Sequence, residues 1–373
     1  MFAPLAGVRV LELAPFLPGP FAGAQLLALG AEVVKLEPPG GDPGRHLPDA
    51  LFAMNNRGKK SVCLNLKAAG ARELMLRLVA GFDVVLEGFR PGVAARLGVD
   101  YETLRQARPD LVYCALSGFG QHGARAAWPG HDLTYLAAAG ALSRPGHWQG
   151  PARRPGVPVA DTAGGLFAAL AVVSALLRRA SSGEGAYLDA SITDAALSLA
   201  ACRGLAPAHS RAHLHPANDV FTCADGVALA AGLLEDHFFS AFVTALGSDG
   251  APLADPRFAT VEERQRHGDA LQRELAAVFA TRTADAWETL GAAHGLPLVR
   301  VRSVAEALAE QGTTVAPAFA VRVDGTRLPP PAAAAPALGA DTAAQLAGIG
   351  YDAAAVGALV AAGVVPPFAV ECA

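Results

Sequence analysis

The chain of 373 residues has no patterned cysteine set. Its five cysteines are scattered and form no C-x-x-C pair; they are Cys63, Cys114, Cys202, Cys223 and Cys372. An odd, unpatterned number argues against a disulfide framework and against a cysteine-based zinc site. We therefore expect reduced thiols in a cytoplasmic protein.

The sequence also lacks an excess of one charge and a long uninterrupted apolar run. Charged residues make up 17%, and the formal net charge of −4 gives no general attraction to nucleic acid or to an anionic membrane. The mean hydropathy is +0.31. However, the best charge-free run, 164–177, reads as a buried helix and is too short to span a bilayer. The start of the chain, 1–4, carries no basic region, so no signal peptide is expected. Neither nucleic acid nor a membrane is expected as a partner.

Strand-like and helix-like segments alternate over the first 200 residues. The apolar run Gly7–Ala14 predicts a buried strand, and P-F-L-P-G-P then opens a helix near Pro20 that ends at Gly30. Ala31–Glu37 predicts a second strand, which completes a βαβ unit. Further strands are expected at 61–66, 83–88, 111–117 and 186–192, with helices at 69–80 and 164–180. This alternation predicts an α/β fold with a doubly wound, Rossmann-like parallel sheet.

The pattern changes near residue 201 and predicts further segments. We expect a large domain at 1–200, a linker at 201–218, a small α+β domain at 219–300, and a return segment at 301–373 whose helices pack on the large domain. Val220–Ala231, with Asp225-Gly226 at its turn, predicts a hairpin in the small domain. The linker holds His209, His213 and His215. Their irregular spacing and the lack of carboxylates favour a solvated loop over a metal site.

The first glycine turn raises the alternative of a dinucleotide-binding site, with Glu37 as the acidic residue after the second strand. The turn reads P-G-P-F-A-G, so Pro20 and Phe21 stand where the fingerprint needs its next glycine. That glycine lets the backbone approach a pyrophosphate. The turn therefore favours a different ligand.

Two proton-transfer groups stand near the openings of predicted helices. His131 lies in G-H-D-L-T-Y-L, before an apolar helical run, and Asp161 lies in P-V-A-D-T-A-G-G-L, at the end of a short extended segment. A histidine and a carboxylate in such positions suggest general acid–base chemistry. Taken alone, His131 is more often a capping or surface group, and Asp161 is most simply an N-cap.

The chain resembles the class III CoA-transferase family over almost its whole length, and within it the α-methylacyl-CoA racemases. The resemblance depends on blocks in the family's order: P-L-A-G-V-R-V-L-E-L-A at 4–14, L-L-A-L-G-A-E-V-V-K-L-E-P-P-G-G-D-P at 26–43, N-R-G-K-K-S-V-C-L-N-L-K at 56–67, G-F-R-P-G-V-A-A-R-L-G at 88–98, S-G-F-G-Q-H-G at 117–123, G-H-D-L-T-Y-L at 130–136 and D-T-A-G-G at 161–165.

The resemblance implies an activity and its catalytic residues. In the transferase branch, an aspartate at the position of Asp161 attacks the acyl-CoA thioester and forms covalent intermediates. The racemase branch keeps this aspartate as an acid–base group and adds a histidine and a glutamate, which match His131 in G-H-D and Glu235 in A-G-L-L-E-D-H-F. The racemase branch is therefore favoured. CoA transfer through an Asp161 anhydride is the alternative, and a non-catalytic CoA-binding protein is a third.

Racemisation of a thioester needs two groups on opposite faces of the α-carbon, with an enolate between them. The resemblance implies an interlocked homodimer in which His131 and Asp161 come from one subunit and Glu235 from its partner. There Glu235 would orient His131 or bias its charge. Backbone N–H groups at the helix start near Asp161 are expected to stabilise the enolate oxygen.

The resemblance also implies how CoA is bound. No cofactor is expected beyond the CoA moiety of the substrate. The residues expected near the adenine and phosphates are Leu64, Lys67, Gly88, Phe89, Arg90 and Arg96. Phe16 and Leu17 are expected along the pantetheine, and Asp132 and Tyr135 are further candidates for CoA contacts. Two departures are Pro38, where many relatives carry arginine that Arg45 could replace, and a linker shorter than in most racemases.

Overall fold

The computed structural model describes residues 2–47, 50–150, 153–205, 207–316 and 319–371; Cys372 lies outside them. The chain divides into two compact units. The first comprises 1–141, 155–200 and 315–373, and the second comprises 142–154 and 201–314. These boundaries differ from the expected ones: 142–154, the expected linker 201–218 and the beginning of the expected return segment all belong to the second unit.

The first unit is built on a six-stranded sheet whose order is β3-β2-β1-β4-β5-β6. All of its neighbouring strands pair in parallel. The strands are β1 (Arg9–Leu13), β2 (Glu32–Glu37), β3 (Lys60–Cys63), β4 (Val84–Glu87), β5 (Val112–Ser117) and β6 (Ala186–Ser191). This order is that of a Rossmann-type sheet, so the predicted doubly wound α/β fold is confirmed.

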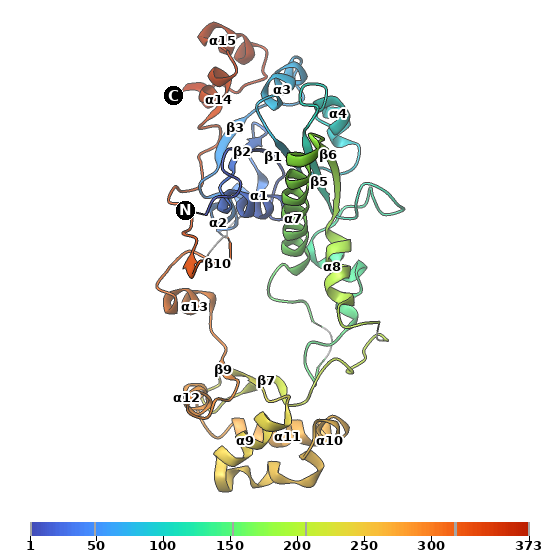
Figure 1. The fold of residues 1–373 in the computed structure, drawn as a ribbon, viewed down its shortest axis with the longest axis vertical. Helices are drawn as coiled ribbons and strands as arrows, with labels where there is room; N and C mark the ends of the chain where they lie inside the picture. The colour runs from blue at the N-terminus through green and yellow to red at the C-terminus, as the bar shows by residue number, and fades with distance from the viewer. Residues whose placement is uncertain (1, 48–49, 151–152, 206, 317–318, 372–373) are drawn as a thin grey trace. The chain divides into compact units, whose positions relative to one another are not determined.

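Helices cover both faces of this sheet. On one face, α1 (Pro18–Ala28) packs against the long helix α7 (Val159–Ser182), as Figure 1 shows. The other face buries alternate strand residues under α3 (Ala71–Val79) and its neighbours. The remaining helices before residue 202 are α2 (Leu51–Asn56), α4 (Val93–Leu97), α5 (Tyr101–Leu104), α6 (Asp132–Ala138), α8 (Ile192–Ala201) and the 3-10 helices Pro43–His46 and Ala141–Ser143.

The C-terminal segment completes the first unit at the outer strand β3. It forms α14 (Thr342–Gly348), α15 (Ala353–Ala361) and α16 (Phe368–Glu371), after the small hairpin β10 (Arg322–Val323) and β11 (Thr326–Arg327). The backbone N–H of Asn65 donates to the carbonyl of Val364 at 2.8 Å. Leu64 still donates to the carbonyl of Glu37 in β2, but from Asn65 the chain bonds to the C-terminal segment, so strand β3 ends at Cys63 rather than at the predicted Leu66.

The second unit is an α+β structure with its own apolar core. Its antiparallel sheet contains β7 (Asn218–Thr222), β8 (Ala228–Gly232) and β9 (Leu298–Arg300). Its helices are α9 (Asp236–Leu246), α10 (Val261–Arg266), α11 (Gly268–Phe279), α12 (Ala284–His294), α13 (Val304–Glu310) and the 3-10 helices Gly247–Ala254 and Pro256–Phe258. The predicted hairpin is confirmed, with Gly226 at φ 76° in its turn.

Trp148 explains why 142–154 belongs to the second unit. Its backbone N–H donates to Asp219 Oδ2 and its indole N–H donates to Asp269 Oδ1, each at 2.8 Å. The sequence placed this segment in the large domain because it precedes α7. Its long-range hydrogen bonds are instead to residues beyond position 200.

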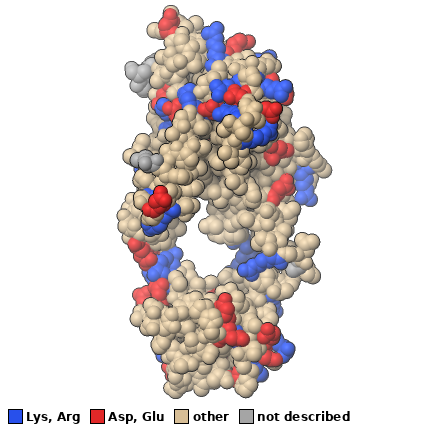
Figure 2. Space-filling model, viewed as in Figure 1, with Lys and Arg blue, Asp and Glu red and all other residues tan. Residues whose placement is uncertain are grey.

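On the face shown in Figure 2, charged side chains of both signs are interspersed, without an extended area of one sign.

Within the described ranges, α7 is the one helix whose length and hydropathy would allow it to cross a membrane. Half of its most apolar window is buried inside the protein, and it packs on α1, α6, β5 and β6.

Candidate active site

Two cavities lie next to each other at the carboxyl edge of the parallel sheet. The first, of about 600 Å³, is called the His131 cavity and contains both His131 and Asp161 in its wall. The second, of about 790 Å³, is called the Lys67 cavity and includes Lys67 and Arg96. Both share Ala14, Pro15 and Phe89, which follow β1 and β4. The chain reverses direction across the sheet between these two strands, which is where open α/β sheets bind their ligands.

Asp161 lies in the first turn of α7, not at the end of an extended segment. This corrects the sequence interpretation, as does the fact that Pro158 is the N-cap. Burial, and to a smaller extent the neighbouring charge of Asp132, raise the pKa of Asp161 to about 7. Its carboxyl group can therefore carry a proton at neutral pH and can also lose it, as an acid–base catalyst requires.

Asp132 caps the helix that carries Asp161. Its Oδ1 accepts hydrogen bonds from the backbone N–H of Ala160 at 2.8 Å and of Asp161 at 3.3 Å. The side chain is buried, and it lines neither cavity. These contacts give Asp132 a role in positioning Asp161. Its expected contact with CoA stays a prediction.

The first N–H groups of α7 are not available to an enolate oxygen. Val159 donates to the carbonyl of Val157 and Thr162 to that of Pro158, while Ala160 and Asp161 donate to Asp132. The expectation that this helix start stabilises the enolate is therefore wrong. These donors are engaged within the first unit.

The glycine pair after Asp161 allows α7 to approach its neighbours closely. A Cβ atom on Gly165 would lie 2.6 Å from the carbonyl oxygen of Pro18, and one on Gly164 would lie 2.8 Å from the side chain of Ile192. Any larger residue would therefore push α7 away from the start of α1 and from α8. The pair keeps Asp161 beside the turn that follows β1.

His131 is the N-cap residue of α6, as the sequence predicted for a helix start. Its backbone N–H donates to Thr134 Oγ1 at 2.9 Å, which secures the first turn. The imidazole is exposed in the described chain and lies edge-on to the ring of Phe16, with ring centroids 6.4 Å apart. An accessible imidazole in the wall of a cavity can exchange protons with a bound molecule.

Tyr135 lies one turn beyond His131 and lines the same cavity. Burial and the charge of Asp161 raise the pKa of its hydroxyl to about 12. The hydroxyl therefore stays protonated and can donate a hydrogen bond. Gly118 and Gly130 make room for the ring, since a Cβ on either would lie within 2.4 Å of it.

The other residues that we expected to contact CoA are divided between the two cavities. Phe16, Gly88, Phe89 and Arg90 line the His131 cavity, and Leu17 does so as well. Leu64, Lys67, Phe89 and Arg96 line the Lys67 cavity. The sequence therefore identified residues that the fold brings to one edge of the sheet.

Glu235 lies in the second unit, as the N-cap residue of α9, and its side chain is exposed. Within one described chain it belongs to a different unit from His131 and Asp161. Its catalytic role stays a prediction that depends on a second subunit.

Glu37 and Arg45, which lie near the first glycine turn, pair with each other. Glu37 accepts two hydrogen bonds from Arg45, at 2.7 Å each, and one from Ser61 Oγ at 2.7 Å. Arg45 also stacks on Phe52 and is absent from the lining of both cavities, whereas Pro38 lines the Lys67 cavity. Arg45 is thus engaged with Glu37, and its replacement of the arginine that many relatives carry at Pro38 stays a prediction.

The sequence did not single out Ser117 and Trp128, which also line the His131 cavity. Ser117 ends β5 and is buried, and its Oγ has no hydrogen-bond partner in the described chain. Trp128 is 57% exposed and lies edge-on to Phe119. Ser117 begins the S-G-F-G block and Trp128 lies two residues before the G-H-D block, and these positions were the available signal.

Within the described residues, no group of three His, Cys, Asp or Glu side chains is arranged to hold a metal ion. The linker histidines have separate contacts: the ring of His213 is 3.0 Å from the carbonyl oxygen of Pro145, and Nδ1 of His215 accepts from the N–H of Ala217. The four described cysteines are all free, and Cys202 alone among them is exposed.

Comparisons with known proteins agree with the fold. The model of CoA-transferase family III matches residues 5–346. The chain is 35% identical to acetyl-CoA:oxalate CoA-transferase of Acetobacter aceti over 344 residues, which cover 87% of each chain. It is 33% identical to α-methylacyl-CoA racemase of Mus musculus over 338 residues, which cover 88% of this chain and 84% of the racemase.

Among solved structures, a CaiB/BaiF family protein from Brucella suis superimposes with a TM-score of 0.82 at 29% identity. The match covers 94% of this chain and all of that one. The resemblance drawn from the sequence blocks is thereby confirmed. The relatives include both transferases and a racemase, so they leave the reaction open.

Proposed function

The chain belongs to CoA-transferase family III, and on that premise we propose that it inverts the 2-methyl centre of an acyl-CoA, as an α-methylacyl-CoA racemase or epimerase. The observation that carries the proposal is that His131 and Asp161 line one cavity. A transferase that works through an aspartyl anhydride needs the carboxylate alone. Two acid–base groups of different kinds are what a two-base inversion needs.

The proton balance of the reaction fits these two groups. When Asp161 is protonated and His131 is neutral, the imidazole removes the α-proton and the carboxyl group delivers its own proton to the opposite face. The enzyme then holds an imidazolium and a carboxylate, and the reverse reaction restores the first state. A pKa of about 7 for Asp161 keeps both of its forms accessible near neutral pH.

The enolate oxygen needs a hydrogen-bond donor, since general acid–base catalysis supplies only about 10²–10⁴-fold. The first N–H groups of α7 are engaged. The hydroxyl of Tyr135 lines the same cavity and stays protonated, so we assign this role to it.

The Lys67 cavity is suited to the nucleotide end of CoA. Lys67 and Arg96 are exposed cations at its rim and can pair with phosphates, while Leu64 belongs to the cavity wall but is buried. The pantetheine would pass over Ala14, Pro15 and Phe89, which both cavities share. The thioester would then lie in the His131 cavity.

An apolar face of α7 supports the proposed homodimer. Leu166, Phe167, Leu170 and Leu177 are between 43% and 75% exposed, although they belong to the longest helix of the first unit. Large exposed apolar side chains grouped on one helix are typical of an interface. In the interlocked dimer that we propose, the small domain of the partner subunit brings Glu235 to His131.

The test is α-proton exchange. A chiral 2-methylacyl-CoA is incubated with the enzyme in deuterated water, and the α-position is followed by NMR together with the ratio of stereoisomers. We expect label to enter as the ratio approaches one. His131→Ala should lose racemisation, and Asp161→Asn should do the same. Full activity of His131→Ala would contradict the two-base mechanism.

CoA transfer is the second candidate, because several relatives at about 35% identity are named CoA-transferases. In that reaction the Asp161 carboxylate attacks the thioester carbonyl, which releases the CoA thiolate and leaves an acyl anhydride. Hydroxylamine would trap this anhydride on Asp161, and CoA would move to an added free acid. Transfer without α-proton exchange would replace the racemase proposal with this one.

A further inference from the structure

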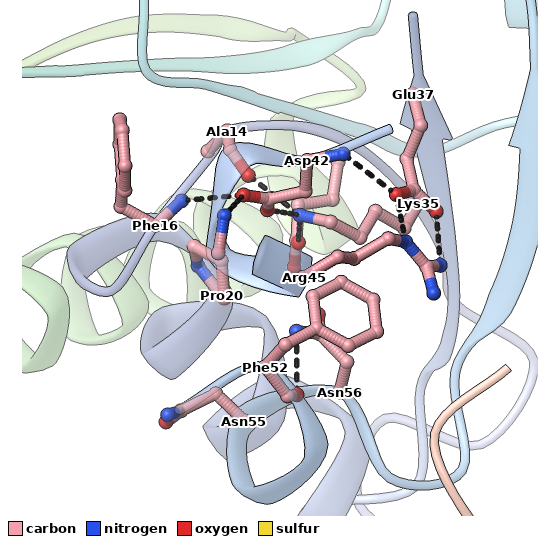
Figure 3. A network of polar contacts seen from close by, with 12 residues as sticks. Ala14, Phe16, Pro20, Lys35, Glu37, Asp42, Arg45, Phe52, Asn55 and Asn56 are labelled. Carbon is pink, nitrogen blue, oxygen red and sulfur yellow. Dashed lines mark hydrogen bonds and ion pairs between the residues drawn. The ribbon is translucent and has the colours of Figure 1, made fainter. Parts of the chain in front are cut away.

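Four charged side chains are buried together next to the turn that follows β1. Figure 3 shows two of them, Lys35 and Asp42, close to Ala14 and Phe16 of that turn. Glu12 of β1 accepts from Lys35 of β2 at 3.0 Å and from Lys59 at 2.7 Å. Lys35 also forms an ion pair with Asp42 at 2.8 Å. All four are at most 4% exposed, and we call them the Glu12 network.

The Glu12 network holds three backbone atoms of residues 14–20, which form the turn after β1 and the first residues of α1 and are called the Phe16 turn. Lys35 Nζ donates to the carbonyl of Ala14 at 2.7 Å, and Lys59 Nζ donates to that of Pro20 at 2.9 Å. Asp42 Oδ1 accepts from the N–H of Phe16 at 3.1 Å. The turn reads A-P-F-L-P-G-P, and its three prolines have no N–H. It therefore depends on these side chains for its shape.

Phe16 needs such support because its backbone has φ 64°. This left-handed conformation costs a non-glycine residue about 1–2 kcal/mol and persists only where the surroundings enforce it. The turn presents the Phe16 ring to the edge of His131, and its residues Ala14 and Pro15 line both cavities. The position of this turn thus defines the path between the two cavities.

Stability alone is a poor explanation for the Glu12 network. Enclosing charges costs several kcal/mol per ion, and well-packed apolar residues often serve equally well. Burial lowers the pKa of Lys59 to about 8 even with Glu12 beside it. Charged groups do provide directional hydrogen bonds to backbone atoms, which apolar side chains cannot.

We infer that Asp42 and Lys35 are positioning residues for the reaction: through the backbone of the turn they hold Phe16 against His131 and fix the passage for pantetheine. The inference rests on the proposed function in so far as His131 is a catalytic group and the substrate is an acyl-CoA. Neither residue needs to touch the reacting atoms, since a misplacement of about 1 Å can cost about 10²-fold in rate.

A double-mutant cycle between Asp42 and Phe16 tests this inference. Asp42→Ala, Asp42→Asn, Phe16→Ala and the Asp42→Ala/Phe16→Ala double variant are compared for kcat and KM of α-proton exchange and for CoA affinity by calorimetry. We expect Asp42→Ala to lower kcat/KM by about 30- to 100-fold. Asp42→Asn should recover part of the activity, because its amide oxygen can still accept from the N–H of Phe16, whereas its amide nitrogen cannot pair with Lys35.

The decisive result is whether the effects of the Asp42 and Phe16 substitutions on kcat/KM are coupled. If Asp42 acts through the turn, the double variant should fall within about threefold of Phe16→Ala alone. Independent, multiplicative effects would overturn the inference, as would a lowered thermal midpoint of Asp42→Ala with unchanged kcat/KM and CoA affinity. Should Asp42→Ala fail to fold, the same cycle is carried out with Lys35→Met and Phe16→Ala, because Lys35→Met removes the donor to the carbonyl of Ala14.

Asp83→Ala is the matched control. Asp83 also accepts a backbone hydrogen bond, from Arg9 at 2.9 Å, and pairs with Arg108 and Arg179, but it precedes β4 at the amino edge of the sheet. It should lower the thermal midpoint and leave KM and CoA affinity unchanged. If the wild-type enzyme shows no α-proton exchange, the proposed function fails, and the coupling between Asp42 and Phe16 is then decided on CoA affinity alone.

Discussion

Asp132 and Asp161 are joined through the backbone: Oδ1 of Asp132 accepts a hydrogen bond from the N–H of Asp161, and a shorter one from the N–H of Ala160. One carboxylate thus fixes the first turn of the helix that carries the other. The negative charge of Asp132 also adds to the effect of burial in raising the pKa of Asp161 to about 7. Asp132 therefore positions the proposed catalytic acid and also contributes, after burial, to its raised proton affinity.

Asp132→Asn should shift the pH dependence of the reaction. An amide oxygen can still cap α7, but the negative charge is removed, so the pKa of Asp161 should fall. In the reaction direction that starts from protonated Asp161, the rate should then decline at lower pH than in the wild type. In the opposite direction, which starts from the Asp161 carboxylate, the rate should reach its plateau at lower pH than in the wild type. Initial rates for both stereoisomers between pH 5 and 9 measure this.

Asp132→Ala separates the two effects, because it removes the cap together with the charge. We expect a stability loss of about 1–2 kcal/mol, as is usual for a lost cap. An Asp132→Asn enzyme with the wild-type pH profile would show that the charge of Asp132 does not act on Asp161.

Asp161→Asn should stabilise the protein at pH 8. A carboxyl group whose folded pKa is raised to about 7 holds its proton in the native state while the unfolded chain has already lost it. This contribution to stability therefore falls as the pH rises from about 4 to 7. The amide has no charge to bury, so we expect a gain of roughly 2 kcal/mol at pH 8 and little gain at pH 5.

Thermal unfolding at both pH values measures this difference, with racemisation abolished in the variant at each. The exposed carboxylate Asp194, in the first turn of α8, supplies the control Asp194→Asn. Its thermal midpoint should follow that of the wild type at both values. An equal gain for Asp161→Asn at pH 5 and pH 8 would speak against the raised pKa.

Lys67→Ala and Arg96→Ala should each raise the KM for acyl-CoA by about three- to tenfold, with kcat little changed. Both side chains are exposed and form no ion pair within the described chain, so phosphates of CoA can reach them. The wild-type KM should increase between 50 and 500 mM KCl, and the variants should depend less on salt. Arg105→Ala, whose side chain pairs with Glu102 away from the cavities, should change neither quantity.

Co-expression of two inactive variants tests the shared active site. If Asp161 and Glu235 act from different subunits, a heterodimer of Asp161→Ala and Glu235→Ala contains one site with both changes and one with none. Random assembly should then restore about a quarter of the wild-type activity. Co-expression is required because interlocked chains cannot exchange after folding. No recovery from a purified heterodimer would place both residues in one subunit.

The periodicity of the first 200 residues predicted the sheet and all six of its strands, since β-branched runs and glycine-ended helices report local conformation. The same local signal placed His131 at a helix start, as found. It misplaced Asp161, because V-A-D reads as an extended segment next to Pro158. The contact that starts α7 earlier comes from Asp132, 29 positions away in the chain.

The sequence by itself thus determined the alternation of strands and helices and the family blocks that include His131 and Asp161. It also determined which residues follow the strands at the carboxyl edge of the sheet. Only the tertiary structure decided that Asp132 caps α7, that the helix-start N–H groups are engaged, and that Trp148 belongs to the second unit. It also brought Glu12, Lys35, Lys59 and Asp42 together behind the Phe16 turn. The reason is that burial and pairing depend on neighbours from distant segments, whereas propensity and spacing describe only adjacent residues.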